Sequence, residues 1–184
     1  MIWKLHKTVV LVGMMGAGKT AVGKAVANNL GVPFLDSDAE IVSAANMSIA
    51  EIFERDGEPF FRARESEVIA RLLDGAPCVL STGGGAFLAE RNRTLISQLG
   101  VSVCLQASLE LLWSRVRNKD TRPLLRTPDP LGALTELYQA RAATYALADI
   151  SVQARDTYSI EDMAAQVIDA LRARPDVLES DENG

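Results

Sequence analysis

A glycine-rich segment near the N-terminus carries the clearest chemical pattern in the chain. It matches the phosphate-binding pattern GxxxxGK[ST], and its eight residues are Gly13, Met14, Met15, Gly16, Ala17, Gly18, Lys19 and Thr20. Glycine takes positive φ without a Cβ clash, so such a loop can turn its backbone N–H groups inward around a polyphosphate. Lys19 would reach the β- and γ-phosphates, and the Thr20 hydroxyl would bind Mg²⁺. The segment therefore predicts a site for a nucleoside triphosphate and Mg²⁺.

Two carboxylates follow a short apolar segment at residues 34–35. Asp36 and Asp38 bracket Ser37, so an extended chain would point both carboxylates to one side. One carboxylate could lie behind the Mg²⁺ ion while the other accepts a hydrogen bond from a substrate hydroxyl. The alternative is a solvated turn in which Asp38 caps a helix over residues 39–44. The sequence leaves both interpretations open at this point.

An arginine and a glutamate lie on one face of a helix that follows Gly57. Arg62 and Glu65 are three residues apart, which places them side by side on a helix. The planar fork of an arginine can bind a carboxylate with two parallel hydrogen bonds, which would suit a carboxylic acid substrate. The alternative is a surface ion pair worth less than about 1 kcal/mol.

Three consecutive glycines follow another strand-like segment at residues 78–82. Gly83, Gly84 and Gly85 would let the backbone approach a ligand closely, although a plain tight turn would use the same residues.

A charged segment with three prolines runs from residue 117 to residue 130. Long irregular segments in compact domains are often functional lids, and Arg122 in this one could close over a transferring phosphoryl group. Residues 118–121 begin like the guanine-reading motif NKxD, but Thr121 stands in place of its aspartate. A GTP site is therefore not expected.

The surrounding sequence alternates strands with helices. The phosphate loop lies between an apolar run at 9–12 and a helix whose apolar residues have helical spacing, as the motif requires. Four more strands are predicted, at 34–36, 78–82, 101–106 and 149–153. Helices are predicted at 49–55, 58–73, 89–99, 108–116, 131–147 and 159–172. This order predicts a single α/β domain over residues 1–174 with a parallel sheet covered on both faces, followed by an acidic segment at 175–184 that we expect to be disordered.

Composition narrows the possible partners. The chain has 184 residues, 48% of them hydrophobic, and a net charge of −5. This charge argues against nucleic acid or an anionic membrane as a partner, so an anionic substrate needs locally placed arginine and lysine. Cys78 and Cys104 lie in apolar runs and are expected to be buried thiols, which suits the cytoplasm. The sole histidine, His6, is expected to have no catalytic role.

Taken together, these patterns resemble the shikimate kinase family. The matching segments are GMMGAGKT at 13–20, Asp-Ser-Asp at 36–38, GEPFFR with Glu65, STGGG at 81–85, TRPLL at 121–125, and Arg141 with Tyr145. The resemblance implies a three-layer P-loop fold with a five-stranded parallel sheet of order 2-3-1-4-5. It also implies a helical substrate-binding segment near residues 37–66 and a lid near residues 116–130.

The resemblance also implies a reaction, the phosphorylation of the 3-hydroxyl of shikimate by ATP with Mg²⁺, in a cytoplasmic monomer. The substrate-binding residues that it implies are Asp38, Phe53, Phe61, Arg62, Glu65, Gly84 and Arg141. Those implied at the nucleotide are Lys19 and Arg122 on the transferring phosphoryl group, Thr20 and Asp36 on Mg²⁺, and Arg155 on adenine, besides the phosphate loop.

Two positions depart from the family pattern. Ala143 stands where the family usually has proline, two residues after Arg141, and the segment around Arg155 matches only loosely. The rival functions are another small-molecule kinase of the same fold, such as a gluconate or nucleotide kinase, and a domain that senses a nucleotide or an acid without turnover.

Overall fold

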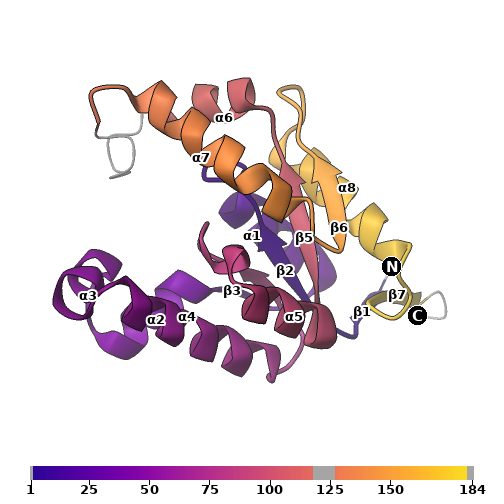
Figure 1. The fold of residues 1–184 in the computed structure, drawn as a ribbon. Helices are drawn as coiled ribbons and strands as arrows, with labels where there is room; N and C mark the ends of the chain where they lie inside the picture. Colours follow the sequence, from indigo (N-terminus) through magenta and orange to yellow (C-terminus); the bar gives the residue numbers. More distant parts are fainter. Residues whose placement is uncertain (1, 118–126, 182–184) are drawn as a thin grey trace.

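A five-stranded parallel sheet forms the centre of the molecule. The computed structural model describes residues 2–117 and 127–181, and its strands lie in the order β3-β4-β2-β5-β6 (Figure 1). These strands are β2 (Thr8–Val12), β3 (Phe34–Asp36), β4 (Val79–Ser81), β5 (Gly100–Gln106) and β6 (Ile150–Gln153). All neighbouring pairs are parallel. Counted from the run at 9–12, this is the predicted order 2-3-1-4-5, which is confirmed.

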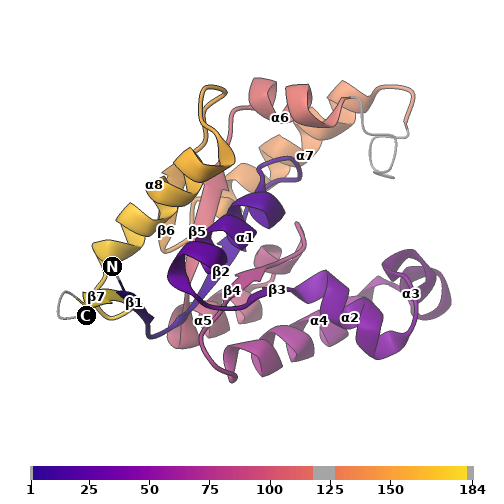
Figure 2. The same cartoon turned by 180° about the vertical axis from the view of Figure 1, so that it is seen from behind.

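Helices cover both faces of the sheet, which explains why the central strands are buried and mostly apolar. Every residue of β2 and β4 is buried, as expected for a parallel strand covered on both sides. Helices α1 (Lys19–Leu30) and α8 (Ile160–Arg172) pack together on one face (Figure 2). Helix α5 (Glu90–Leu99) lies on the other face with the short 3₁₀ helix η1 (Ala86–Leu88) (Figure 1). Helices α6 (Leu109–Val116) and α7 (Pro130–Tyr145) pack against each other.

Three helices beside the sheet have a small apolar core of their own. They are α2 (Ser37–Ala45), α3 (Ile49–Asp56) and α4 (Glu58–Leu73), and their core contains Ile41, Ile52 and Phe61. Ser48 caps α3, because its hydroxyl accepts a hydrogen bond from the Glu51 backbone N–H at 3.1 Å. These three buried residues form a cluster separate from the main core, to which α4 also contributes Ile69 and Leu73.

The expectation of disorder after residue 175 is wrong for the residues that the structure describes. Strand β7 (Leu178–Asp181) pairs antiparallel with β1 (Ile2–Leu5), and the two ends of the chain lie together (Figure 1). Val177 and Leu178 are buried, and Glu179 pairs with His6 at 2.9 Å. The expectation of disorder rested on the acidic composition of the segment, but burial of Val177 and Leu178 anchors it to the rest of the protein. Residues 182–184 lie outside the described residues.

Within the described parts of the chain, no helix combines the length and the apolar character that crossing a membrane would require.

Candidate active site

The phosphate loop connects β2 to α1 and depends on glycine at specific positions. Gly13 has φ 142° and Gly16 has φ 83°, both in a region that other residues rarely adopt. A Cβ would lie 2.9 Å from the Leu105 carbonyl oxygen at Gly13, and 2.8 Å from Val116 Cγ1 at Gly16. The loop therefore takes its shape from backbone that only glycine permits, as a polyphosphate-binding loop requires.

Lys19 lies at the mouth of this loop. Its Nζ donates to the carbonyl oxygens of Gly13 at 2.5 Å and Met14 at 3.3 Å. Burial raises the pKa of the Asp38 carboxyl, and the positive charge of Lys19 partly offsets that rise. Lys19 therefore interacts with both the phosphate loop and Asp38.

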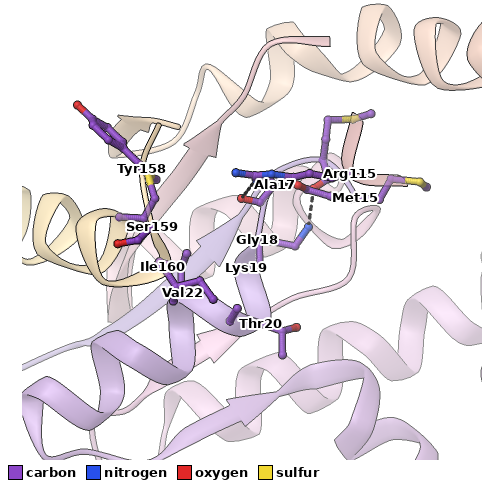
Figure 3. Close-up of a pocket in the computed structure, with 14 residues that line it drawn as sticks. Met15, Ala17, Gly18, Lys19, Thr20, Val22, Arg115, Tyr158, Ser159 and Ile160 are labelled. Atoms are coloured by element: carbon purple, nitrogen blue, oxygen red, sulfur yellow. Dashed lines mark hydrogen bonds between the residues drawn. The ribbon is translucent and has the colours of Figure 1, made fainter. Parts of the chain in front are cut away.

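A cavity of about 490 Å³ surrounds the loop (Figure 3). Its lining combines the loop and the first turn of α1 with Arg115 from α6 and residues at the start of α8, among them Tyr158, Ser159, Ile160 and Met163. Arg115 Nη1 donates to the carbonyl oxygens of Gly16 at 3.0 Å and Ala17 at 3.2 Å, and so holds the loop from α6. All eight predicted loop residues except Gly13 line this cavity.

A second cavity of about 370 Å³ opens on the other side of Lys19. Its lining includes all seven residues that the resemblance implies for substrate, namely Asp38, Phe53, Phe61, Arg62, Glu65, Gly84 and Arg141. Thr20 and Asp36 also line it. These residues come from α1, β3, α2, α3, α4, the segment after β4, and α7, so the fold brings together groups that are far apart in the sequence.

The ion pair between Arg62 and Glu65 is part of the cavity wall. Arg62 Nη1 donates to Glu65 Oε1 at 2.9 Å, and the Glu65 side chain is only 1% exposed. Burial raises the pKa of the Glu65 carboxyl, and the hydrogen bond from Arg62 partly offsets this rise. The alternative of a surface ion pair is therefore wrong. Phe61 lies beneath the Arg62 guanidinium, whose Cζ is 5.2 Å from the ring centroid, and Phe53 lies against Phe61.

The two aspartates have different local roles. Asp36 is the N-cap of α2, and its Oδ1 accepts from the Ala39 backbone N–H at 3.1 Å. The alternative that placed the cap on Asp38 is wrong, because Asp36 ends β3 with the extended backbone that an N-cap requires and α2 already begins at Ser37. Asp38 instead lines the cavity. Burial raises the pKa of its carboxyl, and the negative charge of Asp36 raises it further.

Helix α7 brings Arg141 to the same cavity. Tyr145, one turn further along, donates from its hydroxyl to the Gly84 carbonyl oxygen at 2.5 Å and so fixes α7 to the glycine segment. The helix is continuous from Pro130 to Tyr145 with Ala143 in place of the usual proline, and Arg141 still lines the cavity. The departure at residue 143 therefore does not remove Arg141 from the site.

The two cavities share the residues Met15, Lys19 and Thr20.

A family model described as shikimate kinase matches residues 15–172. The chain belongs to the shikimate kinase family. It is 71% identical over 175 residues to a shikimate kinase from Ruegeria pomeroyi, covering 95% of this chain and 90% of that protein. It is 64% identical over 179 residues to a shikimate kinase from Cereibacter sphaeroides, covering 97% of this chain and 89% of that protein.

A solved structure agrees with this family assignment. A shikimate kinase from Acinetobacter baumannii in complex with shikimate has a TM-score of 0.83 and 36% identity, covering 91% of this chain and 93% of that one.

Two arginines differ in their relation to the cavity at the phosphate loop. Arg155 is not part of its lining, and the Arg155 guanidinium lies over the ring of Tyr158, 5.9 Å from the centroid, so its contact with adenine stays a prediction. Arg115, which the sequence reasoning missed, does line it. Its position could have been inferred only from the fold, since α6 follows β5, the strand beside the one that carries the loop. Arg122 and most of the lid predicted at 116–130 lie outside the described residues.

Proposed function

We propose that this chain transfers the γ-phosphoryl group of ATP to the 3-hydroxyl of shikimate, giving shikimate 3-phosphate and ADP as a step of aromatic amino acid biosynthesis. The observation that carries the proposal is the shared wall of the two cavities, which contains Lys19 and Thr20. A polyphosphate on one side and a hydroxyl on the other would meet at this wall, which is the positioning that phosphoryl transfer requires.

The charges of the substrate cavity support a carboxylic acid as the acceptor. Arg62 and Arg141 would bind the carboxylate, and the buried Glu65 holds the Arg62 fork in one orientation. Asp38 and the backbone of Gly84 would bind the ring hydroxyls. Phe53 and Phe61 supply an apolar wall for the carbon ring, with ring centroids 4.8 Å apart.

Lys19 and Asp38 have different roles in the transfer step. The 3-hydroxyl oxygen forms a bond to the γ-phosphorus as the bond between that phosphorus and the oxygen bridging to the β-phosphate breaks. Lys19 stabilises the charge on the phosphoryl oxygens, and Asp38 orients the hydroxyl and takes its proton late in the step. The raised pKa of Asp38 suits a proton acceptor better than an ordinary aspartate would.

The residues present fit a magnesium ion that is held mainly by the nucleotide. No group of three His, Cys, Asp or Glu side chains suited to a metal occurs within residues 2–117 and 127–181. Mg²⁺ commonly takes only one or two protein oxygens and completes its shell with phosphates and water. Thr20 would be a direct ligand and Asp36 would act through a water molecule, and a magnesium ion there would neutralise charge on the β- and γ-phosphates.

A role for Arg122 on the γ-phosphoryl group remains a prediction from the resemblance, as do the cytoplasmic location and the monomeric state. A size measurement in solution tests the monomer.

An acceptor panel tests the proposed function. ADP release is measured with shikimate, gluconate and nucleoside monophosphates, each with ATP and Mg²⁺. We expect ADP release with shikimate and none with gluconate or the nucleoside monophosphates. Turnover with gluconate or a nucleotide would instead support another small-molecule kinase, and binding of shikimate without ADP release would support a sensing domain.

A further inference from the structure

The three consecutive glycines after β4 have ordinary backbone conformations. Among the described residues, positive φ occurs at five glycines, and none of them is Gly83, Gly84 or Gly85. Gly85, for example, has φ −90° and ψ −12°. Backbone conformation therefore does not explain why this segment lacks side chains.

The space that a side chain would fill is already occupied by charged groups of the protein. A Cβ at Gly83 would lie 2.8 Å from Asp38 Oδ2 and 2.9 Å from Asp38 Oδ1. A Cβ at Gly85 would lie 2.6 Å from Arg62 Nη1 and 2.8 Å from Arg62 Cζ, and closer still to Nη2. Real Cβ atoms essentially never come within 3.0 Å of such atoms. At Gly84 the nearest atom, Arg141 Nη1, would be 3.0 Å away, which is tight but less severe.

The backbone of this segment is anchored, so it cannot easily move away from an added Cβ. The Thr82 hydroxyl donates to the Leu11 carbonyl oxygen at 3.2 Å, which fixes the start of the segment to β2. The Tyr145 hydroxyl holds the Gly84 carbonyl oxygen, and the buried Asn92 amide donates to the Ala86 carbonyl oxygen at 2.8 Å. An added Cβ would therefore displace the facing side chain rather than the backbone.

We propose that Gly83 and Gly85 are positioning residues: the missing Cβ of Gly83 leaves the place in which the Asp38 carboxylate lies, and the missing Cβ of Gly85 leaves the place in which the Arg62 guanidinium lies. Each glycine acts on one charged group. The two groups have different tasks in the proposed function, on which the kinetic part of this inference rests, so the two glycines should have separable effects.

Double-mutant cycles test this pairing. Gly83→Ala should lower kcat with shikimate by about 100-fold, because misplacing a reacting group by about 1 Å can have that effect. In an Asp38→Ala background the same change should alter kcat less than about twofold, since the displaced group is gone. Gly85→Ala should mainly raise the KM for shikimate, and it should have no further effect in an Arg62→Ala background.

The crossed pairs and a matched glycine serve as controls. Gly83→Ala with Arg62→Ala, and Gly85→Ala with Asp38→Ala, should show weaker coupling than the matched pairs: Asp38 and Arg62 interact electrostatically, but neither added Cβ faces the second group. Gly75 lies outside both cavities, and a Cβ there would be at an ordinary 3.4 Å from the Leu72 carbonyl oxygen. Gly75→Ala should therefore leave kcat and both KM values unchanged. Equal losses from Gly83→Ala with and without Asp38 would overturn the proposal.

Thermal unfolding gives a readout that needs no turnover. Gly83→Ala should lower Tm in the parent and lower it less in the Asp38→Ala background. If Gly83→Ala alone does not fold, the double variant should fold, and a double variant that is equally unfolded would overturn the inference. A parent chain that releases no ADP with shikimate would remove the proposed function, while the thermal cycles would still decide this inference.

Discussion

The two cavities that meet at Lys19 are built by different means. The nucleotide cavity takes most of its lining from one continuous stretch, residues 14–22, completed by Arg115 and the start of α8. Its shape comes from glycine backbone at Gly13 and Gly16. The substrate cavity instead collects single side chains from several separate elements, and its polar groups are placed by packing against one another.

This difference affects how each cavity responds to change. The phosphate loop lies between a fully buried strand and the first turn of α1, and Arg115 from α6 adds two hydrogen bonds to it. The substrate cavity depends on α2, α3 and α4, whose small core contains only Ile41, Ile52 and Phe61 among its buried residues. We therefore expect substitutions at the shared wall to harm both functions, and substitutions deeper in either cavity to affect one substrate at a time.

Lys19→Met should have the largest effect, because Lys19 lines both cavities. We expect kcat/KM to fall by about 10³-fold, the size seen when one donor to a developing charge is removed. Steady-state kinetics with both substrates varied would measure it. Lys24→Met, on the exposed side of the same helix, is the matched control and should change kcat/KM less than about twofold. A Lys19 variant that only weakened ATP binding would break the idea of a shared wall.

Asp38→Asn should lower kcat by about 100-fold and leave the KM for ATP nearly unchanged, since it removes a proton acceptor from one cavity only. The parent enzyme should also lose kcat as the pH falls through the pKa of Asp38, which burial and Asp36 hold above the usual 3.8. The sign follows because only the ionised carboxylate can accept the proton. A pH profile of kcat measures this, and full turnover in Asp38→Asn would exclude the role.

Arg62→Lys should raise the KM for shikimate by about 10- to 100-fold, because a point charge replaces a fork that makes charge-assisted hydrogen bonds of about 1.5–3 kcal/mol each. The chain offers a close control in Arg64, which makes the same i,i+3 pair with Glu67 at 2.9 Å but is 56% exposed. Arg64→Lys should change neither KM. A rise in the KM for ATP with an unchanged KM for shikimate would show that Arg62 has been assigned to the wrong cavity.

Arg115→Ala should raise the KM for ATP by about tenfold, because it removes two hydrogen bonds to the loop of about 1 kcal/mol each. Arg155→Ala should have less effect, since the Arg155 guanidinium lies over the ring of Tyr158 and is not part of the cavity lining. Isothermal titration with a non-hydrolysable ATP analogue separates the two. The reverse ranking would restore Arg155 as the arginine that contacts the nucleotide.

The same contrast between local and assembled structure decided what the sequence could predict. The phosphate loop follows from a contiguous motif and the parallel sheet from a regular alternation of elements, whereas the strand order came from the family resemblance. The pairing of Arg62 with Glu65 followed from helical spacing, but its burial did not, because burial depends on elements that arrive from elsewhere in the chain. Arg115 carries no local signal for the same reason. Asp38, Arg62, Glu65 and Gly84 were candidates from their residue types and spacing, whereas Phe53, Phe61 and Arg141 could be named only through the family resemblance.

The paired ends of the chain should matter least for catalysis, since β1 and β7 contribute no lining residue to either cavity. Leu178 is nevertheless 2% exposed, so Leu178→Ala should lower stability by about 2–4 kcal/mol through the cavity it leaves. For a chain of this length that corresponds to a fall in Tm of roughly 4–16 °C. Glu179→Ala, which removes only a partly exposed contact with His6, should lower stability by less than about 1 kcal/mol. Thermal unfolding measures both, and kinetics at a temperature where each variant is folded should give unchanged kcat and KM values. A changed KM in Leu178→Ala would mean that the terminal sheet communicates with one of the cavities, and which of the two KM values moved would identify the cavity.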